Sequence, residues 1–168
     1  MTDPSLQRRL AAIVVADVVG YSRLMEADEV ATLENLRELR SGTIEPAVMR
    51  HKGRIFKVMG DGFLIEFGSA VEAVAAALEM QLANAAVEAS GDRRLLLRIG
   101  VNLGDVIDEG SDVLGDGVNV AARLERLAAP GGICISSSVH GEILGKIDDR
   151  FFDAGERYLK NLTRPVHV

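Results

Sequence analysis

The pattern of apolar and polar residues predicts that the chain opens with a buried strand followed by a helical segment. Residues 10–18 read LAAIVVADV, an apolar run with one aspartate, which is typical of a strand covered on both faces. Leucines and alanines at helical spacing follow, and Ser22 is the predicted cap of this helix. Gly42 and Pro46 predict that the helix is broken or kinked.

Two short apolar runs in the next part of the chain predict a hairpin that leads into a long helix. The strands cover residues 54–59 and 63–67, and glycines lie in the turn between them. Ser69 followed by Glu72 has the spacing of a capping box, a pattern that opens helices. The alanine-rich segment that begins there predicts a helix to about Ser90.

The second half of the chain predicts shorter elements. Residues 95–104 predict a strand, and a connection rich in glycine and aspartate leads from it to a helix over 118–128. Pro130 and the glycine pair after it end that helix. The remaining predicted elements are a short strand at 133–136, a helix at 139–147 and a hairpin-like segment from 151.

The order of these elements predicts an α+β fold. Strand, helix, strand, strand, helix, strand is the βαββαβ order of ferredoxin-like folds, here with a C-terminal α/β extension. That layout places the first strand beside the third, so the end of the strand 10–18 is expected close to the hairpin 54–67. We expect residues 1–9 to be a lead-in and residues 10–168 to form one domain, a piece of a longer protein.

The composition excludes several classes of protein. A chain of 168 residues with 48% hydrophobic and 26% charged residues predicts one globular domain. The net charge of −6, without a basic stripe, argues against a nucleic-acid partner. The single cysteine, Cys134, lies in an apolar run, so we expect a buried thiol. No apolar run reaches the roughly 18 residues of a membrane span and no signal peptide is evident, so we expect a cytoplasmic domain without a membrane segment.

Two aspartates are the first candidates for chemistry. Asp17 lies in the apolar strand and Asp61 lies in the hairpin turn. A carboxylate in a buried strand is costly unless a partner or a cation compensates its charge. Two anions a few Å apart would repel by roughly 4 kcal/mol at an effective dielectric near 20, which a divalent ion would reverse. The pair therefore predicts a magnesium or manganese site.

Other candidates surround these aspartates and lie on the later helix. Gly20, followed by Tyr21 and Ser22, can turn tightly and present backbone amides to an anion such as phosphate. Asn119 and Arg123 are four residues apart, so they share one face of the predicted helix beside an apolar stripe.

Each candidate also has an ordinary structural explanation. Asp61 followed by Gly62 is a favoured hairpin turn, and a strand-end aspartate such as Asp17 can cap a helix. Polar residues on one side of a helix, such as Asn119 and Arg123, are most often a solvated face.

Three motifs occur in order along the chain and carry a resemblance to a known family. They are ADVVGYS around Asp17, KVMGDGFLIEF around Asp61, and DVLGDGVNVAARLE from Asp112. Together they resemble the catalytic domain of class III nucleotidyl cyclases, the adenylate and guanylate cyclase family, and are most like those of a bacterial adenylate cyclase. The resemblance covers about residues 10–166, with no large gap.

The resemblance implies a role for each motif. Asp17 and Asp61, with the backbone carbonyl of Val18, would bind two divalent cations, Mg²⁺ or Mn²⁺. Asn119 would orient the ribose, and Arg123 would stabilise negative charge on the reacting phosphate. The residues expected to contact the rest of the nucleotide are Gly20, Tyr21, Ser22, Lys57, Asp112 and Lys160; for Lys160, Asn161 replaces the glycine that usually follows in the family.

The pair Lys57 and Asp112 indicates the substrate. In the family these positions read the purine; an aspartate can accept from the exocyclic amine of adenine and a lysine can donate to a ring nitrogen. Guanine would place its O6 acceptor against Asp112, and guanylate-specific members typically carry glutamate and cysteine here. We therefore expect an adenylate cyclase that converts ATP to 3′,5′-cyclic AMP and pyrophosphate.

The resemblance also implies a head-to-tail homodimer with shared sites. One chain would supply Asp17 and Asp61, and the other would supply Lys57, Asp112, Asn119 and Arg123. The dimerisation arm of many family members is short or missing in this chain. In the full-length protein, we expect the domain to be fused to regulatory domains.

Three alternatives remain open at this point. A catalytically silent cyclase-like domain could serve dimerisation or regulation. A palm-type polymerase or diguanylate cyclase would share the two-metal logic, but MGDGF is not its GGDEF-like turn. A guanylate cyclase is opposed by Lys57 and Asp112.

Overall fold

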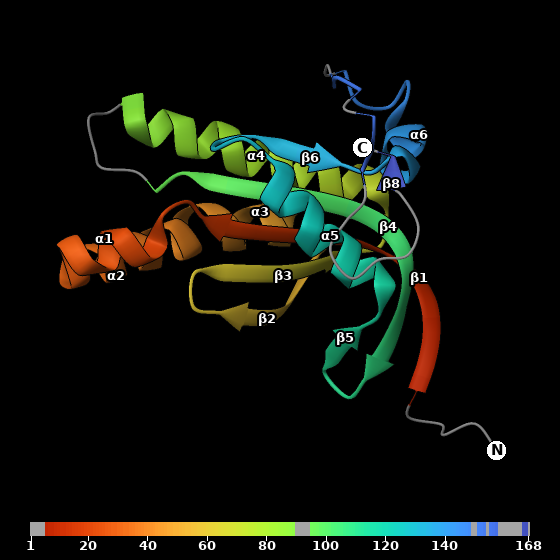
Figure 1. Ribbon diagram of the computed structural model, residues 1–168, viewed down its shortest axis with the longest axis horizontal. Helices are drawn as coiled ribbons and strands as arrows, with labels where there is room; N and C mark the ends of the chain where they lie inside the picture. Colours follow the sequence, from red (N-terminus) through yellow and green to blue (C-terminus); the bar gives the residue numbers. More distant parts are fainter. Residues whose placement is uncertain (1–5, 90–94, 149–150, 154, 158–165, 168) are drawn as a thin grey trace.

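The chain folds around one mixed sheet in the computed structural model, which describes residues 6–89, 95–148, 151–153, 155–157 and 166–167 (Figure 1). The elements in chain order are β1 (Leu6–Val18), α1 (Tyr21–Ala27), α2 (Glu29–Leu39), the π-helix η1 (Arg40–Ile44), α3 (Glu45–Arg50), β2 (Arg54–Met59), β3 (Gly62–Phe67), α4 (Ala70–Ala89), β4 (Leu97–Glu109), β5 (Asp112–Leu114), α5 (Asp116–Leu127), β6 (Ile133–Ile135), α6 (Ser137–Ile143), β7 (Glu156–Arg157) and β8 (Val166–His167).

The order of the strands confirms the predicted ferredoxin-like core. The sheet runs β2-β3-β1-β4-β5, and β6 pairs with β4 in parallel. Strand β1 lies between β3 and β4 and is antiparallel to both, so the first and third strands are neighbours, as the element order predicted. The short pair β7 and β8 forms a separate antiparallel ribbon near the end of the chain.

The two faces of the sheet are covered unequally. Alternate residues of β1 point to opposite faces, and every residue from Ala11 to Ala16 is at most 6% exposed. Helices α2, α3, α4 and α6 pack against one face, together with residues of β1 such as Ala12 and Val14. The opposite face, with Ile13 and Val15, is packed by α5 (Figure 1). We call this second side of the sheet the α5 face.

The helical segment after β1 is broken in more places than the sequence predicted. Asp28 separates α1 from α2 and caps α2, because its side chain accepts a hydrogen bond from the amide of Ala31 at 3.1 Å. A π-helical turn that contains Gly42 then joins α2 to α3, whose second residue is Pro46. Ser22 lies inside α1, and Gly20 takes the capping position that we predicted for Ser22.

Helix α4 is the most apolar helix of the fold. The amide of Glu72 donates to the Ser69 hydroxyl at 3.1 Å, which confirms one half of the predicted capping box. Within the described residues, Ala70–Val87 is long and apolar enough to cross a membrane, with a mean hydropathy of 1.2 over 18 residues. Its residues Ala73, Ala77 and Met80 are fully buried against the sheet, and 39% of this segment is buried in all.

Helix α5 lies against β4 through glycine contacts. A Cβ atom at Gly100 would lie 2.3 Å from the amide nitrogen of Glu125 and 2.4 Å from the carbonyl oxygen of Ala121. The start of the helix is held to β4 by a hydrogen bond. The side-chain amide of the buried Asn102 donates to the Gly117 carbonyl at 3.1 Å. Only glycine at position 100 therefore allows α5 to approach the strand this closely.

A side-chain contact joins β1 to β4 at the far end of the sheet. The guanidinium of Arg9 donates to the carboxylate of Asp108 at 2.7 and 2.9 Å. The hydrogen bond from Arg9 is the main cause that holds the pKa of Asp108 below its ordinary value. The side chains are 39% and 30% exposed, so the stabilisation is that of a surface ion pair.

We predict that Gly100→Ala lowers the free energy of unfolding by about 1–3 kcal/mol, because the added methyl group meets backbone atoms of α5 that cannot rotate away. Gly42→Ala is the control, since nothing lies within 4 Å of a Cβ at that position. Urea denaturation of both variants and the unchanged protein measures the effect. An equal change in the free energy of unfolding for the two variants would contradict close packing at Gly100.

We also predict an acid-dependent contribution from Asp108. Its folded-state pKa lies below the ordinary value of 3.8, so its stabilisation is present above that pH and is lost as the pH falls through the folded-state pKa. Asp108→Asn is expected to lower the free energy of unfolding by up to about 1 kcal/mol at neutral pH and by nearly nothing at strongly acid pH. Urea denaturation at both pH values tests this, and a difference that does not change with pH would refute it.

Candidate active site

Asp17 lies at the end of β1, on the α5 face of the sheet. It follows the alternation of Ile13 and Val15, which point to that face, and it pairs in register with Arg98 of β4. Its neighbours in β1, Ala16 and Val18, are buried on the other face. Asp17 itself is only partly buried. The position is therefore accessible at the point where the sheet ends.

Asp61 lies beside Asp17, as the element order predicted. The backbone amide of Val18 donates to its Oδ2 atom at 3.3 Å, which joins the β2–β3 turn to the end of β1. Burial, and then the negative charge of Asp17, raise the pKa of Asp61, while hydrogen bonds from backbone amides oppose the rise. The two carboxyl groups are thus close enough to influence each other electrostatically.

The turn that carries Asp61 does not need an aspartate for its geometry. Met59 pairs with Gly62, so Gly60 and Asp61 are the two central residues. Gly60 has a φ of 60°, which supplies the positive φ that the first central position of a type II′ turn requires. A preference for Asp-Gly at the centre of a hairpin turn therefore does not explain Asp61, because Gly62 lies outside the centre of this turn.

These donors fit a divalent cation of the magnesium or manganese kind. Carboxylate and carbonyl oxygens are the ligands that such hard cations prefer, and Asp17, Asp61 and the carbonyl of Val18 supply them. Among the described residues, no group of three or more His, Cys, Asp and Glu side chains could hold a metal. Part of the coordination shell would thus have to come from phosphate oxygens and water, which is usual for Mg²⁺.

The turn after Asp17 has the expected tight geometry. Gly20 has φ 67° and ψ 29°, a left-handed conformation that favours glycine. Tyr21 and Ser22 then begin α1, with Tyr21 packed against the core and Ser22 exposed. The first helical turn therefore begins four residues after Asp17, in the segment predicted to hold phosphate groups.

A bulge in β2 directs Lys57 to the α5 face. The register shifts between Ile55 and Lys57, so that Lys57 pairs with Leu64. Leu64 packs on the α5 face, and residues directly opposite each other in an antiparallel pair share a face. Without the extra residue, strict alternation would place Lys57 on the same side as Ile55.

Lys57 and Asp112, the pair predicted to read the base, lie close together across the edges of the sheet. The Nζ atom of Lys57 lies 3.5 Å from Oδ2 of Asp112, while Oδ1 accepts from the amide of Val113 at 2.9 Å. A distance of 3.5 Å is the outer limit of a hydrogen bond, and the side chains are 43% and 36% exposed. Both groups are therefore free to bind a ligand instead of each other.

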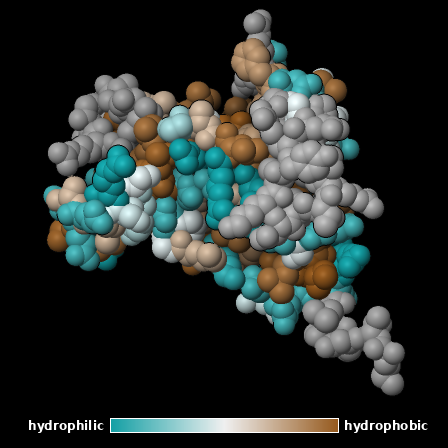
Figure 2. Space-filling model, viewed as in Figure 1, coloured by the Kyte–Doolittle hydropathy of each residue, from teal (hydrophilic) through white to brown (hydrophobic). Residues whose placement is uncertain are grey.

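Asn119 and Arg123 lie on α5, as predicted. Asn119 is exposed and Arg123 is half-buried. Within the part of the chain that the structure describes, neither side chain has a hydrogen bond or ion pair, so both can receive a ligand. Figure 2 shows hydrophilic surface over the middle of this side of the molecule, where α5 runs, with hydrophobic surface on either side. Lys160 lies outside the described residues.

A buried acid next to Asp17 was not among the residues predicted from the sequence. Glu125 on α5 is 4% exposed, and burial, followed by a hydrogen bond with Asp17 and the charge of Asp17, raises its pKa to about 8. Arg98 opposes that rise, although its own Nε atom is buried without a hydrogen-bond partner in the described structure. The signal was present in the sequence, because Glu125 lies four residues after Ala121 in the buried stripe of α5.

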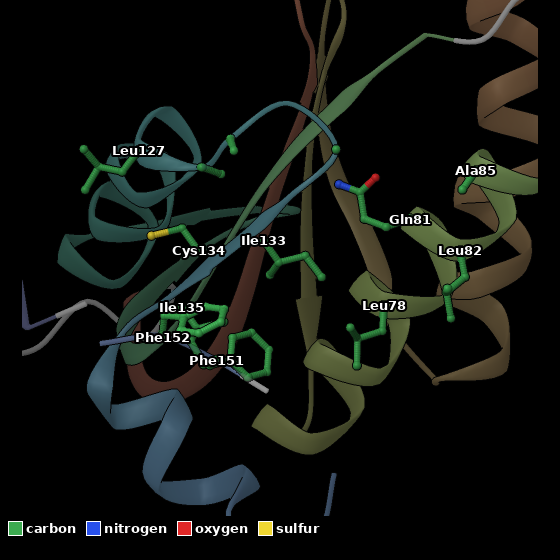
Figure 3. Close-up of a pocket in the computed structure, with 13 residues that line it drawn as sticks. Leu78, Gln81, Leu82, Ala85, Leu127, Ile133, Cys134, Ile135, Phe151 and Phe152 are labelled. Carbon is green, nitrogen blue, oxygen red and sulfur yellow. The ribbon is translucent and has the colours of Figure 1, made fainter. Parts of the chain in front are cut away.

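The largest described pocket lies away from these residues. It has a volume of about 590 Å³ and lies between α4, β6 and the end of α5, with Leu78, Leu82 and Ile133 among its apolar lining (Figure 3). Cys134 also lines it and is half-buried, which is less buried than the sequence predicted. None of the predicted site residues lines this pocket, so the candidate site lies outside it.

Comparisons with known proteins bear on these residues. Residues 6–164 match the family described as "Adenylate and Guanylate cyclase catalytic domain". A protein of Rhizobium meliloti (strain 1021) named "Putative adenylate cyclase 3" is 53% identical over 170 residues, which cover 100% of this chain and 29% of that protein. The chain thus spans less than a third of this relative's length.

Two solved structures have the same fold over nearly their whole length. The crystal structure of an adenylate/guanylate cyclase/hydrolase from Silicibacter pomeroyi superposes with a TM-score of 0.90 at 43% identity, covering 96% of this chain and 95% of that one. The adenylyl cyclase CyaB from P. aeruginosa superposes with a TM-score of 0.82 at 26% identity, covering 96% and 93%.

Proposed function

The chain belongs to the class III adenylate and guanylate cyclase catalytic domains, and on that premise we propose that it converts ATP to 3′,5′-cyclic AMP and pyrophosphate in a homodimer. Family membership alone leaves open whether ATP or GTP is the substrate. The approach of Lys57 to Asp112 at 3.5 Å is the observation that carries the choice of ATP.

Lys57 and Asp112 together offer a donor and an acceptor to one purine edge. Adenine presents an exocyclic amine that Asp112 can accept from, and a ring nitrogen to which Lys57 can donate. With guanine, Asp112 would face the O6 acceptor, which leaves a carboxylate and a carbonyl oxygen without a proton between them. The pair therefore favours adenine by a mismatch penalty as well as by two direct hydrogen bonds.

Asp17, Asp61 and the carbonyl of Val18 are the proposed ligands of two divalent cations. Bound there, such cations would lower the pKa of the ribose 3′-hydroxyl and neutralise the triphosphate. The first turn of α1, from Gly20 through Ser22, would hold phosphate oxygens with its amides. Burial, and then the charge of Asp17, raise the pKa of Asp61, and a cation bound there would offset both effects, which supports this assignment.

Asn119 and Arg123 act on the reacting part of the nucleotide in this proposal. The ribose 3′-oxygen attacks the α-phosphorus, the bond to pyrophosphate breaks, and the hydroxyl proton leaves to water, since none of the site residues is an evident general base. Asn119 orients the ribose by hydrogen bonding. Arg123 stabilises the negative charge that develops on the phosphate, for which a planar guanidinium is better suited than an ammonium group.

The proposed dimer joins two incomplete sites. The end of β1 and the β2–β3 turn lie toward α1 at the left of the sheet in Figure 1, whereas β5, which begins with Asp112, lies at the lower right. Family members are typically dimeric, and a head-to-tail arrangement would bring the aspartates of one chain to the base-reading pair of its partner. A site formed between two chains also accounts for the distance of the largest described pocket from these residues.

We predict that the purified domain forms cyclic AMP from ATP with Mg²⁺ or Mn²⁺, and that cyclic GMP formation from GTP is at least about tenfold less efficient in kcat/KM. Excess EDTA is expected to abolish both reactions, because the cations neutralise the triphosphate. Chromatographic measurement of both products with each metal tests this. Efficient use of GTP would instead support a guanylate cyclase, and no product from a dimeric preparation would support a silent domain.

We predict that Asp17→Ala and Arg123→Ala each reduce turnover by more than about 100-fold. Co-expression of the two variants is expected to restore about a quarter of the unchanged activity, because half of the dimers are mixed and each has one intact site of two.

Asp17→Ala with Asp61→Ala is the matched control for this experiment. Both changes affect the same half of the site, so their mixed dimers have no intact site and should stay inactive. Activity in the control, or its absence in the first mixture despite mixed dimers seen by native mass spectrometry, would refute the shared site.

A further inference from the structure

A row of charged side chains crosses the α5 face of the sheet from strand to strand. Asp108 of β4 binds Arg9 of β1, and Arg9 also binds Glu66 of β3. Glu66 in turn accepts from the Nε atom of Arg54 of β2 at 2.7 Å. Acidic and basic groups alternate along this row of side chains, so each charge lies next to an opposite one.

Arg54, the last side chain of this row, reaches the turn before Asp112. The Nη1 atom of Arg54 donates to the backbone carbonyl of Ser111 at 3.2 Å. Ser111 directly precedes Asp112, and Gly110 before it has a φ of 62°, as a tight turn requires. Arg54 therefore holds the backbone at the start of β5. In its own strand, β2, Arg54 lies three residues before Lys57.

This contact joins the two outer strands of the main sheet order. Strands β2 and β5 are at opposite ends of the order β2-β3-β1-β4-β5, so no ladder hydrogen bonds link them. Arg54 with Ser111, and Lys57 with Asp112, bridge this gap. Figure 1 shows β2 and β5 on the same lower side of the molecule.

Of the two bridges, the one made by Arg54 is the better anchored. Lys57 and Asp112 are 3.5 Å apart and must leave each other to bind a base. The guanidinium of Arg54 is fixed by Glu66, whose side chain is only 14% exposed and is shared with Arg9. Charge-assisted hydrogen bonds of this kind are stronger than neutral ones, and the planar fork of arginine can bind both partners at once.

We propose that Arg54 is a positioning residue for purine recognition, which holds the turn before Asp112 at the distance from Lys57 at which both reach one base. The proposal rests on the proposed nucleotide cyclase function. Arg54 does not need to touch the nucleotide, since it acts through the backbone of Ser111. Its loss should impair recognition of the base and leave the phosphate chemistry at Asp17, Asp61 and Arg123 intact.

The first test compares Arg54→Ala with Arg40→Ala in steady-state kinetics with ATP and GTP. We expect Arg54→Ala to raise the KM for ATP about three- to tenfold, to change kcat less than about twofold, and to lower the ratio of kcat/KM for ATP over GTP by a similar factor. Arg40 is a matched control, because its side chain is 47% exposed, against 48% for Arg54, and pairs with Glu45 away from the site. Arg54→Lys should lie between the two, since it retains one charge without the fork.

A second variant, Glu66→Gln, tests the same proposal if the Arg54→Ala protein does not fold. Glu66→Gln preserves the size of the side chain and removes the charge that anchors Arg54, so the ATP to GTP ratio should fall in the same direction. Circular dichroism and thermal unfolding of each variant show whether it is folded. A folded Arg54→Ala or Glu66→Gln protein with the unchanged ratio would overturn the proposal.

The complementing pair of variants separates positioning from general destabilisation. In the mixture of Asp17→Ala and Arg123→Ala chains, only the Asp17→Ala chain supplies a working base-reading half. Arg54→Ala placed in that chain should lower the ATP to GTP ratio, whereas the same change in the Arg123→Ala chain should not. Equal effects in both placements would overturn the positioning role, while an unchanged protein that forms no cyclic nucleotide would refute the proposed function itself.

Discussion

The antiparallel pairing of β1 with β3 is the constraint on which the candidate site depends. It brings the β2–β3 turn to the end of β1, where the amide of Val18 donates to Asp61. Burial and the nearby charge of Asp17 together raise the pKa of Asp61, which means that the ionised form of this carboxyl group is disfavoured there. The pairing therefore keeps two carboxylates together at a cost in free energy that a divalent cation would remove.

A second constraint is the close contact between α5 and β4. Gly100 admits the backbone of α5 directly onto the strand, and this fixes the face on which Asn119 and Arg123 stand. The same contact buries Glu125 against Asp17, so the helix that presents the proposed phosphate-stabilising arginine also reaches the proposed metal ligand. One packing interface thus links the two groups of candidate residues within a single chain.

The edges of the sheet add a third level of organisation. A bulge turns Lys57 to the α5 face, and Arg54 ties its strand to the turn before Asp112. These contacts are between exposed or half-exposed groups and contribute little to stability. In the proposed function their value would lie in geometry, because a purine edge is read only when a donor and an acceptor stand at a defined separation.

The sequence by itself indicated the βαββαβ order of the core, the buried character of β1, the hairpin over residues 54–67 and the face shared by Asn119 and Arg123, because these follow from local periodicity and glycine chemistry. Three motifs in order were also enough to indicate the family. Tertiary structure alone decided that Phe56 is bulged out of register and Lys57 faces α5, that Glu125 meets Asp17, and that Arg54 reaches Ser111. These contacts depend on strand register, sheet curvature and helix approach, which join residues far apart in the chain. The periodicity of α5 indicates that Glu125 is buried, but not which residue it meets.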